Sequence, residues 1–371
     1  MVPSRRKSKL RTFDYEYLLD LTSTPSAVTA GGKRSAFTFD PISAALNNAD
    51  NDQGKRKYDY TDQGYLLREE WTDAQTPDTY HREYRNSLQG RTFAMDDSNG
   101  MPTRHGYDAH GRLIWTTQGR LRADFTYDNN GRLQFTPTRD LDSDYTLQCE
   151  QQYDSRGREE TRILTLFKGK TPGELKIIKQ RWRDDGMLHS RSLWREDQQL
   201  LLETFSYDAL DRLIGYVCES ETGDYPRNAK GRPIKEQSYE FDDLDNLTYS
   251  RTDFADGEKD KAYFTCEGFQ LKNATHTHPD YLPSMDFAYD DDGNMLNDEL
   301  GHKLRYDESG RLQEVRSQDD KQTLLTYRYD GHGHLIGAKA AGEEEELRRY
   351  QGNRLVCTRA GTTELYYLHD G

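Results

Sequence analysis

The sequence predicts an all-β protein, built as an array of β-hairpins that form a curved or spiralling antiparallel sheet. First, a seven-residue pattern, Y-D-x-x-G-R-L, recurs along most of the chain. Second, its copies follow one another at intervals near the roughly 20–50 residues that are typical of repeat arrays. Third, the sequence signals no helix longer than a turn or two.

The pattern is clearest at Tyr306–Leu312 and predicts a turn with a strand on each side. A type I turn favours Asp at its first position and Gly at its fourth, the spacing of Asp307 and Gly310. A left-handed Gly310 makes this a three-residue hairpin loop closed by a bulge. Asp307 then faces Arg311 on one face, and Tyr306 faces Leu312 on the other. Such pairs contribute about 0.2–1 kcal/mol each, so one copy would not fold alone.

Two copies, at Tyr207 and Phe241, place Asp211 and Asp245 where Gly is expected, and Asp tolerates a left-handed backbone. The copy at Trp182 is looser, and Tyr60–Leu66, Phe264–Gly268 and Tyr350–Leu355 are degenerate. The residues predicted to form the structural repeat turns are Tyr107, Asp108, Gly111, Arg112, Tyr127, Asp128, Gly131, Arg132, Tyr153, Asp154, Gly157, Tyr207, Asp208, Arg212, Tyr289, Asp290, Gly293, Tyr306, Asp307, Gly310, Arg311, Tyr329, Asp330 and Gly333.

The repeats argue for one continuous array over residues 11–371, preceded by a basic tail at residues 1–10. Within the array we expect residues 11–58 to be irregular and 59–160 to be repeats. Residues 161–203 should hold longer strands and loops, and 204–371 the densest repeats.

The apolar content is low, since Leu, Ile, Val and Phe make up 64 of 371 residues, or about 17%. Disorder becomes a serious alternative below about 20%, but disorder does not predict periodic turns. A thin wall around a wet interior has less core per residue than a solid domain. The composition therefore favours a partial hollow shell over a packed sandwich.

Several classes of protein are disfavoured. The net charge of −14 argues against a nucleic-acid binder, and no run of 18 apolar residues predicts a membrane span. The basic N-terminus lacks the apolar region of a signal peptide. Cys149, Cys218, Cys266 and Cys357 form no C-x-x-C and predict neither a zinc site nor a disulfide framework.

The repeats resemble the Rhs/YD-repeat family over residues 58–371. Over 205–312 the chain is also similar to the C-type (TccC-like) subunits of bacterial insecticidal Tc toxin complexes. The stretches that carry this narrower resemblance are Phe205–Glu219, Phe241–Leu247, Thr275–Tyr281 and Tyr289–Met295. In that family the hairpins wind into a hollow β-shell around a toxic polypeptide, which implies a scaffold role here.

One departure bears on function. Family members continue into a core-associated aspartyl autoprotease with Asp-Pro motifs, whereas the one Asp-Pro here is Asp40-Pro41, early in the chain. We therefore expect the autoprotease and toxin domains to be absent from this sequence. The resemblance implies two partners, another Rhs/Tc-type shell subunit and an enclosed toxin polypeptide, and export from a bacterium as part of a toxin complex.

Candidates for chemistry are few. Asp290–Asn294 invites a calcium site but lacks the Gly and Glu of an EF-hand loop. His276-x-His278 and His332-x-His334 each place two imidazoles on one strand face, without a visible third metal ligand. No nucleophile-elbow, zincin or P-loop motif occurs. We expect no catalytic residue, no metal and no cofactor.

Three functions remain open. The leading hypothesis is a structural, non-catalytic shell component that encapsulates or presents a toxin. The alternative is a module that binds glycans or cell surfaces through aromatic side chains. An enzyme comes third. The fixed place of each Tyr before its turn favours packing on the neighbouring hairpin over display.

Overall fold

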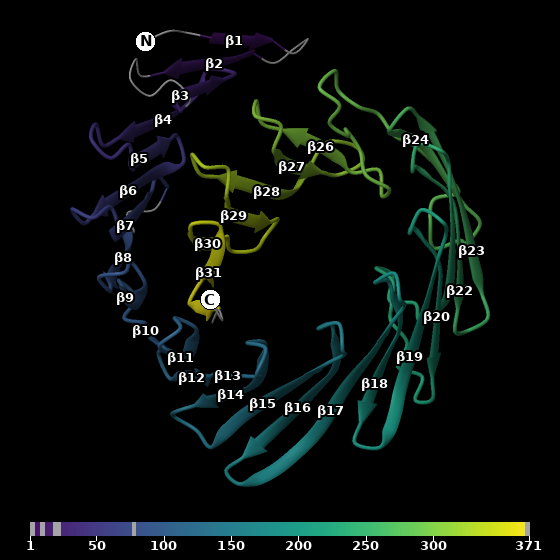
Figure 1. The fold of residues 1–371 in the computed structure, drawn as a ribbon. Helices are drawn as coiled ribbons and strands as arrows, with labels where there is room; N and C mark the ends of the chain where they lie inside the picture. The colour runs from purple at the N-terminus through teal and green to yellow at the C-terminus, as the bar shows by residue number, and fades with distance from the viewer. Residues whose placement is uncertain (1–3, 8–11, 18–23, 76–78, 368–371) are drawn as a thin grey trace. The chain divides into compact units, whose positions relative to one another are not determined.

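The described part of the chain consists of β-strands and turns, without a helix, which confirms the predicted all-β hairpin array (Figure 1). A computed structural model describes residues 4–7, 12–17, 24–75 and 79–367. Neighbouring strands pair antiparallel through short hairpins. No helix among these residues is long and apolar enough to cross a membrane.

The strands fall into two sheets. The first contains β1 (Ser4–Lys7), β2 (Thr12–Tyr17), β3 (Pro25–Ala30), β4 (Lys33–Phe39), β5 (Leu46–Asn51), β6 (Gly54–Tyr60), β7 (Leu66–Asp73), β8 (Thr79–Asn86), β9 (Thr92–Asp97), β10 (Thr103–Tyr107), β11 (Leu113–Gln118), β12 (Leu121–Asp124), β13 (Thr126–Tyr127), β14 (Leu133–Asp140), β15 (Tyr145–Tyr153), β16 (Glu159–Lys168), β17 (Thr171–Trp182), β18 (Leu188–Arg195), β19 (Gln198–Tyr207), β20 (Leu213–Ser220), β21 (Ile234–Phe241), β22 (Leu247–Phe254), β23 (Lys259–Glu267), β24 (Gln270–His276) and β25 (Ser284–Asp286). The second contains β26 (Lys303–Tyr306), β27 (Leu312–Arg316), β28 (Thr323–Tyr329), β29 (Leu335–Ala340), β30 (Glu346–Gln351), β31 (Arg354–Ala360) and β32 (Thr363–Tyr366).

The chain divides into two compact units that are each discontinuous in sequence. Unit 1 comprises Met1–Gly106, Thr116–Gly119 and Ala288–Gly371, and unit 2 comprises Tyr107–Trp115 and Arg120–Phe287. Unit 1 therefore combines the first strands of the long sheet with the second sheet. Unit 2 is built from the remainder of the long sheet.

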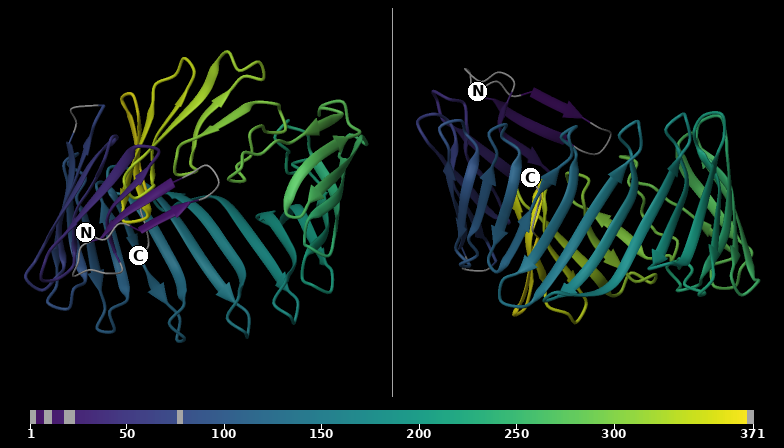
Figure 2. Two further views of the ribbon diagram at one scale, coloured as in Figure 1. Left: turned by 90° about the horizontal axis from the view of Figure 1, so that it is seen from above. Right: turned by 60° about the horizontal axis from the view of Figure 1, so that its bottom comes forward.

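Unit 2 contains the longest strands, which run side by side in Figure 2. β15, β16 and β17 are 9, 10 and 12 residues long, and every one of their side chains is at least partly exposed. A sheet of this length without a buried face is a single layer with solvent on both sides, as the low apolar content indicates.

The connections in residues 161–203 differ from the longer loops expected there. Gly169 and Lys170 join β16 to β17, and Glu196 and Asp197 join β18 to β19. Gly169 and Glu196 have φ angles of 59° and 52°, the left-handed conformation that tight hairpin turns require. The strands are long, as expected, but the turns are short.

The N-terminal part of unit 1 is more regular than the sequence suggested. Residues 25–60, within or next to the segment expected to be irregular, form β3 to β6, which pair in chain order. Ser4–Lys7, inside the expected basic tail, form β1 and pair with β2. The remaining residues of that tail lie outside the described residues.

Replacing Gly310 by Val tests the turn geometry on which these hairpins rest. Gly310 has a φ of 83°, which a β-branched residue adopts only under strain. We expect Gly310→Val to cost about 1–3 kcal/mol of stability. Gly310→Asn is the matched control and should cost clearly less, because Asn tolerates this conformation. Equal unfolding free energies for the two variants in urea titrations would contradict the assignment.

Candidate functional site: coupled repeat turns and a charged layer in unit 1

Each repeat turn is closed by its own aspartate. In the copy at Tyr306, the Gly310 N–H donates to the Asp307 carbonyl at 2.9 Å. Asp307 Oδ1 accepts the N–H groups of Ser309 and Arg311, and Oδ2 accepts from Arg311 Nε at 2.7 Å. One short carboxylate thus binds three donors of its own turn, as Asp side chains do in Asx-turns. Tyr306 pairs with Leu312, the register expected from the sequence.

The other strong copies have the same geometry. The carboxylates that accept both N–H groups and the side chain at the arginine position are those of Asp108, Asp128, Asp154, Asp208, Asp242, Asp290 and Asp330. Where that position holds Asn or His, Asn246, Asn294 or His334 replaces the guanidinium. The Arg112 backbone N–H and then its guanidinium lower the pKa of Asp108 to about 2.

Consecutive turns are coupled through the aromatic residue of the motif. The hydroxyl of Tyr153 donates to the carbonyl of Leu133 in the preceding repeat at 2.6 Å. The guanidinium of Arg132, also in that repeat, lies 4.5 Å from the centre of the Tyr153 ring. This repeat is therefore held to the preceding one by one hydrogen bond and one cation–π contact.

This coupling recurs along both units. Other tyrosine hydroxyls that donate to a leucine carbonyl are those of Tyr60, Tyr127, Tyr207, Tyr329 and Tyr350. Other arginines that stack on the aromatic residue of the next repeat are Arg112, Arg158, Arg212 and Arg311. These contacts show that the aromatic residues of the motif pack on the preceding repeat.

Sequence reasoning missed further copies of the turn, including one at Ser87–Gly90 in which the serine hydroxyl is the acceptor. Asn228 with Gly231 and Asp298 with Gly301 form the same hydrogen bonds, but neither follows an aromatic residue. The D/N-x-x-G spacing alone was the signal. Two degenerate candidates proved different, since Gly268–Phe269 and Gly352–Asn353 form two-residue turns, in which Glu267 pairs with Gln270 and Gln351 with Arg354.

The acidic stretch at Asp290 is an ordinary repeat turn. Asp290 Oδ1 accepts the N–H groups of Asp292 and Asn294, and Oδ2 accepts from Asn294 Nδ2. These oxygen atoms are engaged within the turn. Among the described residues no group of three or more His, Cys, Asp or Glu is placed to hold a metal ion.

The histidine pairs are bound to neighbouring polar side chains. His276 Nδ1 lies 2.8 Å from Asp260 Oδ2, and its ring stacks on Tyr281. His278 is buried and its Nε2 lies 2.7 Å from Glu258 Oε2. His332 Nε2 lies 3.1 Å from the hydroxyl of Tyr58.

Charged residues join the two sheets of unit 1, where β28 to β31 lie beside β4 to β9 in Figure 1. We call these residues the charged layer. Asp330, which is fully buried within it, lies 3.0 Å from Arg56 Nε on β6 and 3.0 Å from His334 Nδ1. Burial alone would raise the pKa of Asp330, but the His334 hydrogen bond and the Arg56 charge lower it instead. The repeat aspartate here closes its own turn and also anchors the second sheet on the first.

Further polar contacts extend this charged layer. Arg328 on β28 binds Asp73 on β7 at 3.0 Å and Glu345 at 2.7 Å. Arg82 on β8 donates to Gln351 Oε1 at 3.1 Å. Buried apolar residues accompany these polar contacts, among them Tyr80 of the first sheet and Ile336 of the second, which line one small cavity.

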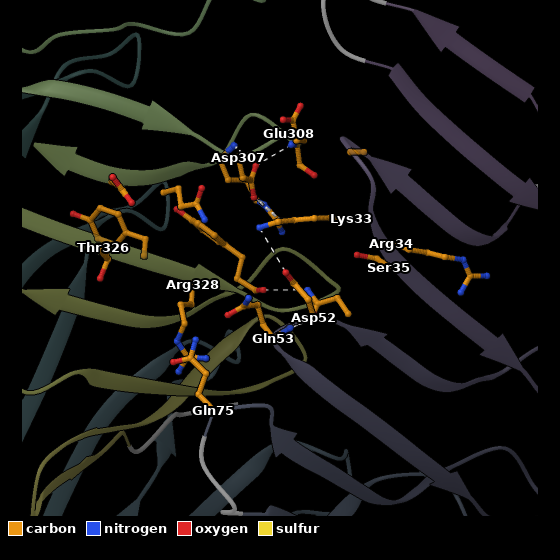
Figure 3. A pocket seen from close by; sticks show the side chains of 18 of the residues that line it. Lys33, Arg34, Ser35, Asp52, Gln53, Gln75, Asp307, Glu308, Thr326 and Arg328 are labelled. Atoms are coloured by element: carbon orange, nitrogen blue, oxygen red, sulfur yellow. Dashed lines mark hydrogen bonds and ion pairs between the residues drawn. The ribbon is translucent and has the colours of Figure 1, made fainter. Parts of the chain in front are cut away.

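A pocket of about 350 Å³ opens beside this layer in unit 1 (Figure 3). Its walls carry both signs of charge, and Lys33 Nζ lies 3.6 Å from Asp52 Oδ2 across it. Arg311 and Arg328 are paired with Asp307 and Glu345. The lining is therefore mainly polar and charged.

Comparison with known proteins gives a likeness of fold. No family model and no curated protein matches the chain. A chain of the TcdB2–TccC3–Cdc42 crystal structure aligns over 97% of this chain and 24% of its own length, with a TM-score of 0.57 and 13% identity. A chain of the Photorhabdus luminescens Tc holotoxin pore, with a mutation in TccC3, aligns over 95% and 21%, with a TM-score of 0.55 and 14% identity.

A chain of the TcdB2–TccC3 crystal structure gives a TM-score of 0.56 at 14% identity. The chain thus has a Tc/Rhs-like β fold and spans about a quarter of the length of the chains that it matches.

The charged layer makes the stability of unit 1 depend on pH. The hydrogen bond to Asp330 raises the pKa of His334 above its ordinary value, against the effect of burial. The stabilisation is therefore complete below about pH 6.5 and is lost as pH rises through the raised pKa. His334→Asn is a matched reference, because Asn246 and Asn294 make the same hydrogen bond without titrating.

We expect the stability difference between wild type and His334→Asn to shift against the wild type as pH rises from 6 to 8.5. Amide hydrogen exchange in β28 and β29 measures the stability of each protein. Comparing the two proteins at the same pH removes the intrinsic pH dependence of exchange. Parallel pH profiles for the two proteins would show that His334 has no such role.

Proposed function

We propose that the chain is an Rhs/YD-repeat protein and a structural, non-catalytic wall component of a secreted bacterial toxin complex, where it encloses or presents a toxin polypeptide. The main observation in support of this proposal is the single-layer sheet of unit 2. β15 to β17 have no buried side chain, although each is 9 to 12 residues long. A sheet that is accessible on both faces suits a wall that separates a cargo from solvent.

The mode of assembly supports this role. Several hairpins, such as those of Tyr127 and Tyr153, are held to the preceding one through the Tyr hydroxyl and an Arg–aromatic contact, so the wall extends without a thick core. The similar chains come from structures of Tc toxin complexes, and this chain spans about a quarter of their length. We therefore propose two kinds of partner, further shell subunits and an enclosed toxin polypeptide.

The non-catalytic part of the proposal rests on how the polar residues are used. The repeat aspartates close turns, and His276, His278 and His334 bind neighbouring acidic side chains. Incubation of the purified chain should accordingly leave its intact mass unchanged. Appearance of two complementary fragments would reveal a self-cleaving enzyme.

The glycan-binding alternative finds little support in the repeat tyrosines. Tyr127 and Tyr153 each have the hydroxyl bonded to a preceding leucine carbonyl and one ring face covered by arginine. A sugar would have to displace these contacts in order to stack on the rings.

Small-angle scattering of the purified chain tests the wall proposal. A compact protein of this length has a radius of gyration of about 21 Å. A wall around a cargo space should give a clearly larger radius and a pair-distance distribution whose maximum is shifted to longer distances than in a solid protein. A radius equal to the compact value would remove the enclosing role, and specific binding in a glycan array would then favour the recognition module.

A further inference from the structure

Three alternate hairpin tips of unit 2 each present one large apolar side chain to solvent. Leu210, Leu244 and Phe269 are 69%, 52% and 81% exposed. They occupy the turns between β19 and β20, between β21 and β22, and between β23 and β24. Single exposed apolar residues are common on proteins, but a regular row of them is not.

The turn itself does not require these residues. Leu210 and Leu244 stand at the third position of the repeat turn, where most other copies carry polar residues and the copy at Asp298 carries Leu300. The polar residues are His110, Asn130, Arg156, Asp185, Lys230, Asp292, Ser309 and His332. An exposed apolar side chain at this position therefore has no structural role in closing the turn.

The three tips lie along one rim of the sheet. Alternate turns of an antiparallel meander fall on the same side, and β19 to β24 pair in chain order. Tips separated by two strands are about 10 Å apart, since neighbouring strands lie about 4.8 Å apart. The row therefore has a regular spacing.

Hydrogen bonds fix the tips to one another. Arg212 Nη1 donates to Asp245 Oδ1 at 2.8 Å, and Asn246 Nδ2 donates to the carbonyl of Gly268 at 2.9 Å. Asp245 occupies a position with a φ of 64°, where most copies have Gly, and its side chain supplies the link. The row is thus held in place before any partner binds.

The same rim is acidic. Six carboxylates lie in these three turns or at their ends: Asp208, Asp211, Asp242, Asp243, Asp245 and Glu267. Two bases pair with some of them, Arg212 with Asp208 and Asp245, and Lys272 with Glu267. Asp245 and Glu267 have side chains that are 73% and 83% exposed. A partner of this rim needs apolar groups about 10 Å apart and cationic groups beside them.

We propose that this row, Leu210–Leu244–Phe269, is a docking ridge for a cationic amphipathic α-helix of a partner protein. Residues one heptad apart on a helix are about 10.5 Å apart along its axis, which matches the spacing of the tips. Lys and Arg beside the apolar stripe would face the acidic turns. The acidic rim disfavours an anionic bilayer as the occupant, and the inference does not depend on a toxin-complex role.

A labelled 21-residue helical peptide with Leu at heptad positions and Lys beside them is the probe, titrated onto the full chain by fluorescence anisotropy. The test variant is Leu210→Ser/Leu244→Ser/Phe269→Ser. The positions of Leu210 and Leu244 are polar in most other copies of the turn, so we expect the fold to be retained. Leu88→Ser/Leu300→Ser, which removes exposed apolar side chains from tips in unit 1, is the matched control.

We expect saturable binding that weakens at least about tenfold in the triple variant and is unchanged in the control. A scrambled peptide of the same composition should bind at least about tenfold more weakly. No binding, or equal binding of the two peptides, would overturn the proposal.

Two further measurements address other occupants. Binding to phosphatidylcholine vesicles, with or without phosphatidylglycerol, that the triple variant loses would reassign the ridge to membranes. Self-association in sedimentation that the triple variant abolishes would reassign it to a second copy of the chain. Either result would overturn a helix as the occupant.

Discussion

The structure depends on an interaction between neighbouring repeats rather than within one. A repeat turn closes itself through the aspartate carboxylate, but a lone hairpin is marginal in water. The Arg132 guanidinium on the Tyr153 ring, and the Tyr153 hydroxyl on the Leu133 carbonyl, couple one hairpin to the next. Repetition of these two contacts replaces the thick apolar core that this composition does not supply.

The same turn has a different surrounding in each of the two units. In unit 2 the turns form one rim of a sheet whose long strands stay accessible on both faces. In unit 1 the turn at Asp330 is buried, and its carboxylate binds Arg56 across the contact between the two sheets. Breaking such a buried pair leaves an uncompensated charge, so the docking of the second sheet has a strict geometric requirement. A departure from the repeat sequence can also mark a contact between turns. Asp245 replaces the usual Gly, and its side chain binds Arg212 of the neighbouring tip.

The features that could be predicted from the sequence are those set by residues close together in the chain. Asp307 and Gly310 indicate their turn because the carboxylate, the two N–H groups and the left-handed glycine all lie within five residues. The stacking of Arg132 on Tyr153 was not foreseen in detail, because it requires knowing how far each strand extends. The tight turns at Gly169 and Glu196 were missed because neither has a repeat motif.

Long-range partners were beyond a single sequence. Arg56 and Asp330 are distant in the chain, and nothing near either residue points to the other. The turns at Asn228 and Asp298 were overlooked because the motif was anchored on its aromatic residue, which takes no part in the hydrogen bonds of the turn. The exposed tips at Leu210 and Leu244 are visible in the sequence, but their alignment on one rim follows from the pairing of β19 to β24.

The most direct test of the account is a double-mutant cycle between Arg132 and Tyr153. Arg132→Ala, Tyr153→Ala and the double variant are compared by hydrogen exchange at the amides of β14 and β15. The account predicts a favourable coupling of about 0.5–1 kcal/mol between the two side chains. The same cycle between Arg132 and the more distant Tyr207 should give none. A coupling of zero between Arg132 and Tyr153 would mean that the repeats are not held together by this contact.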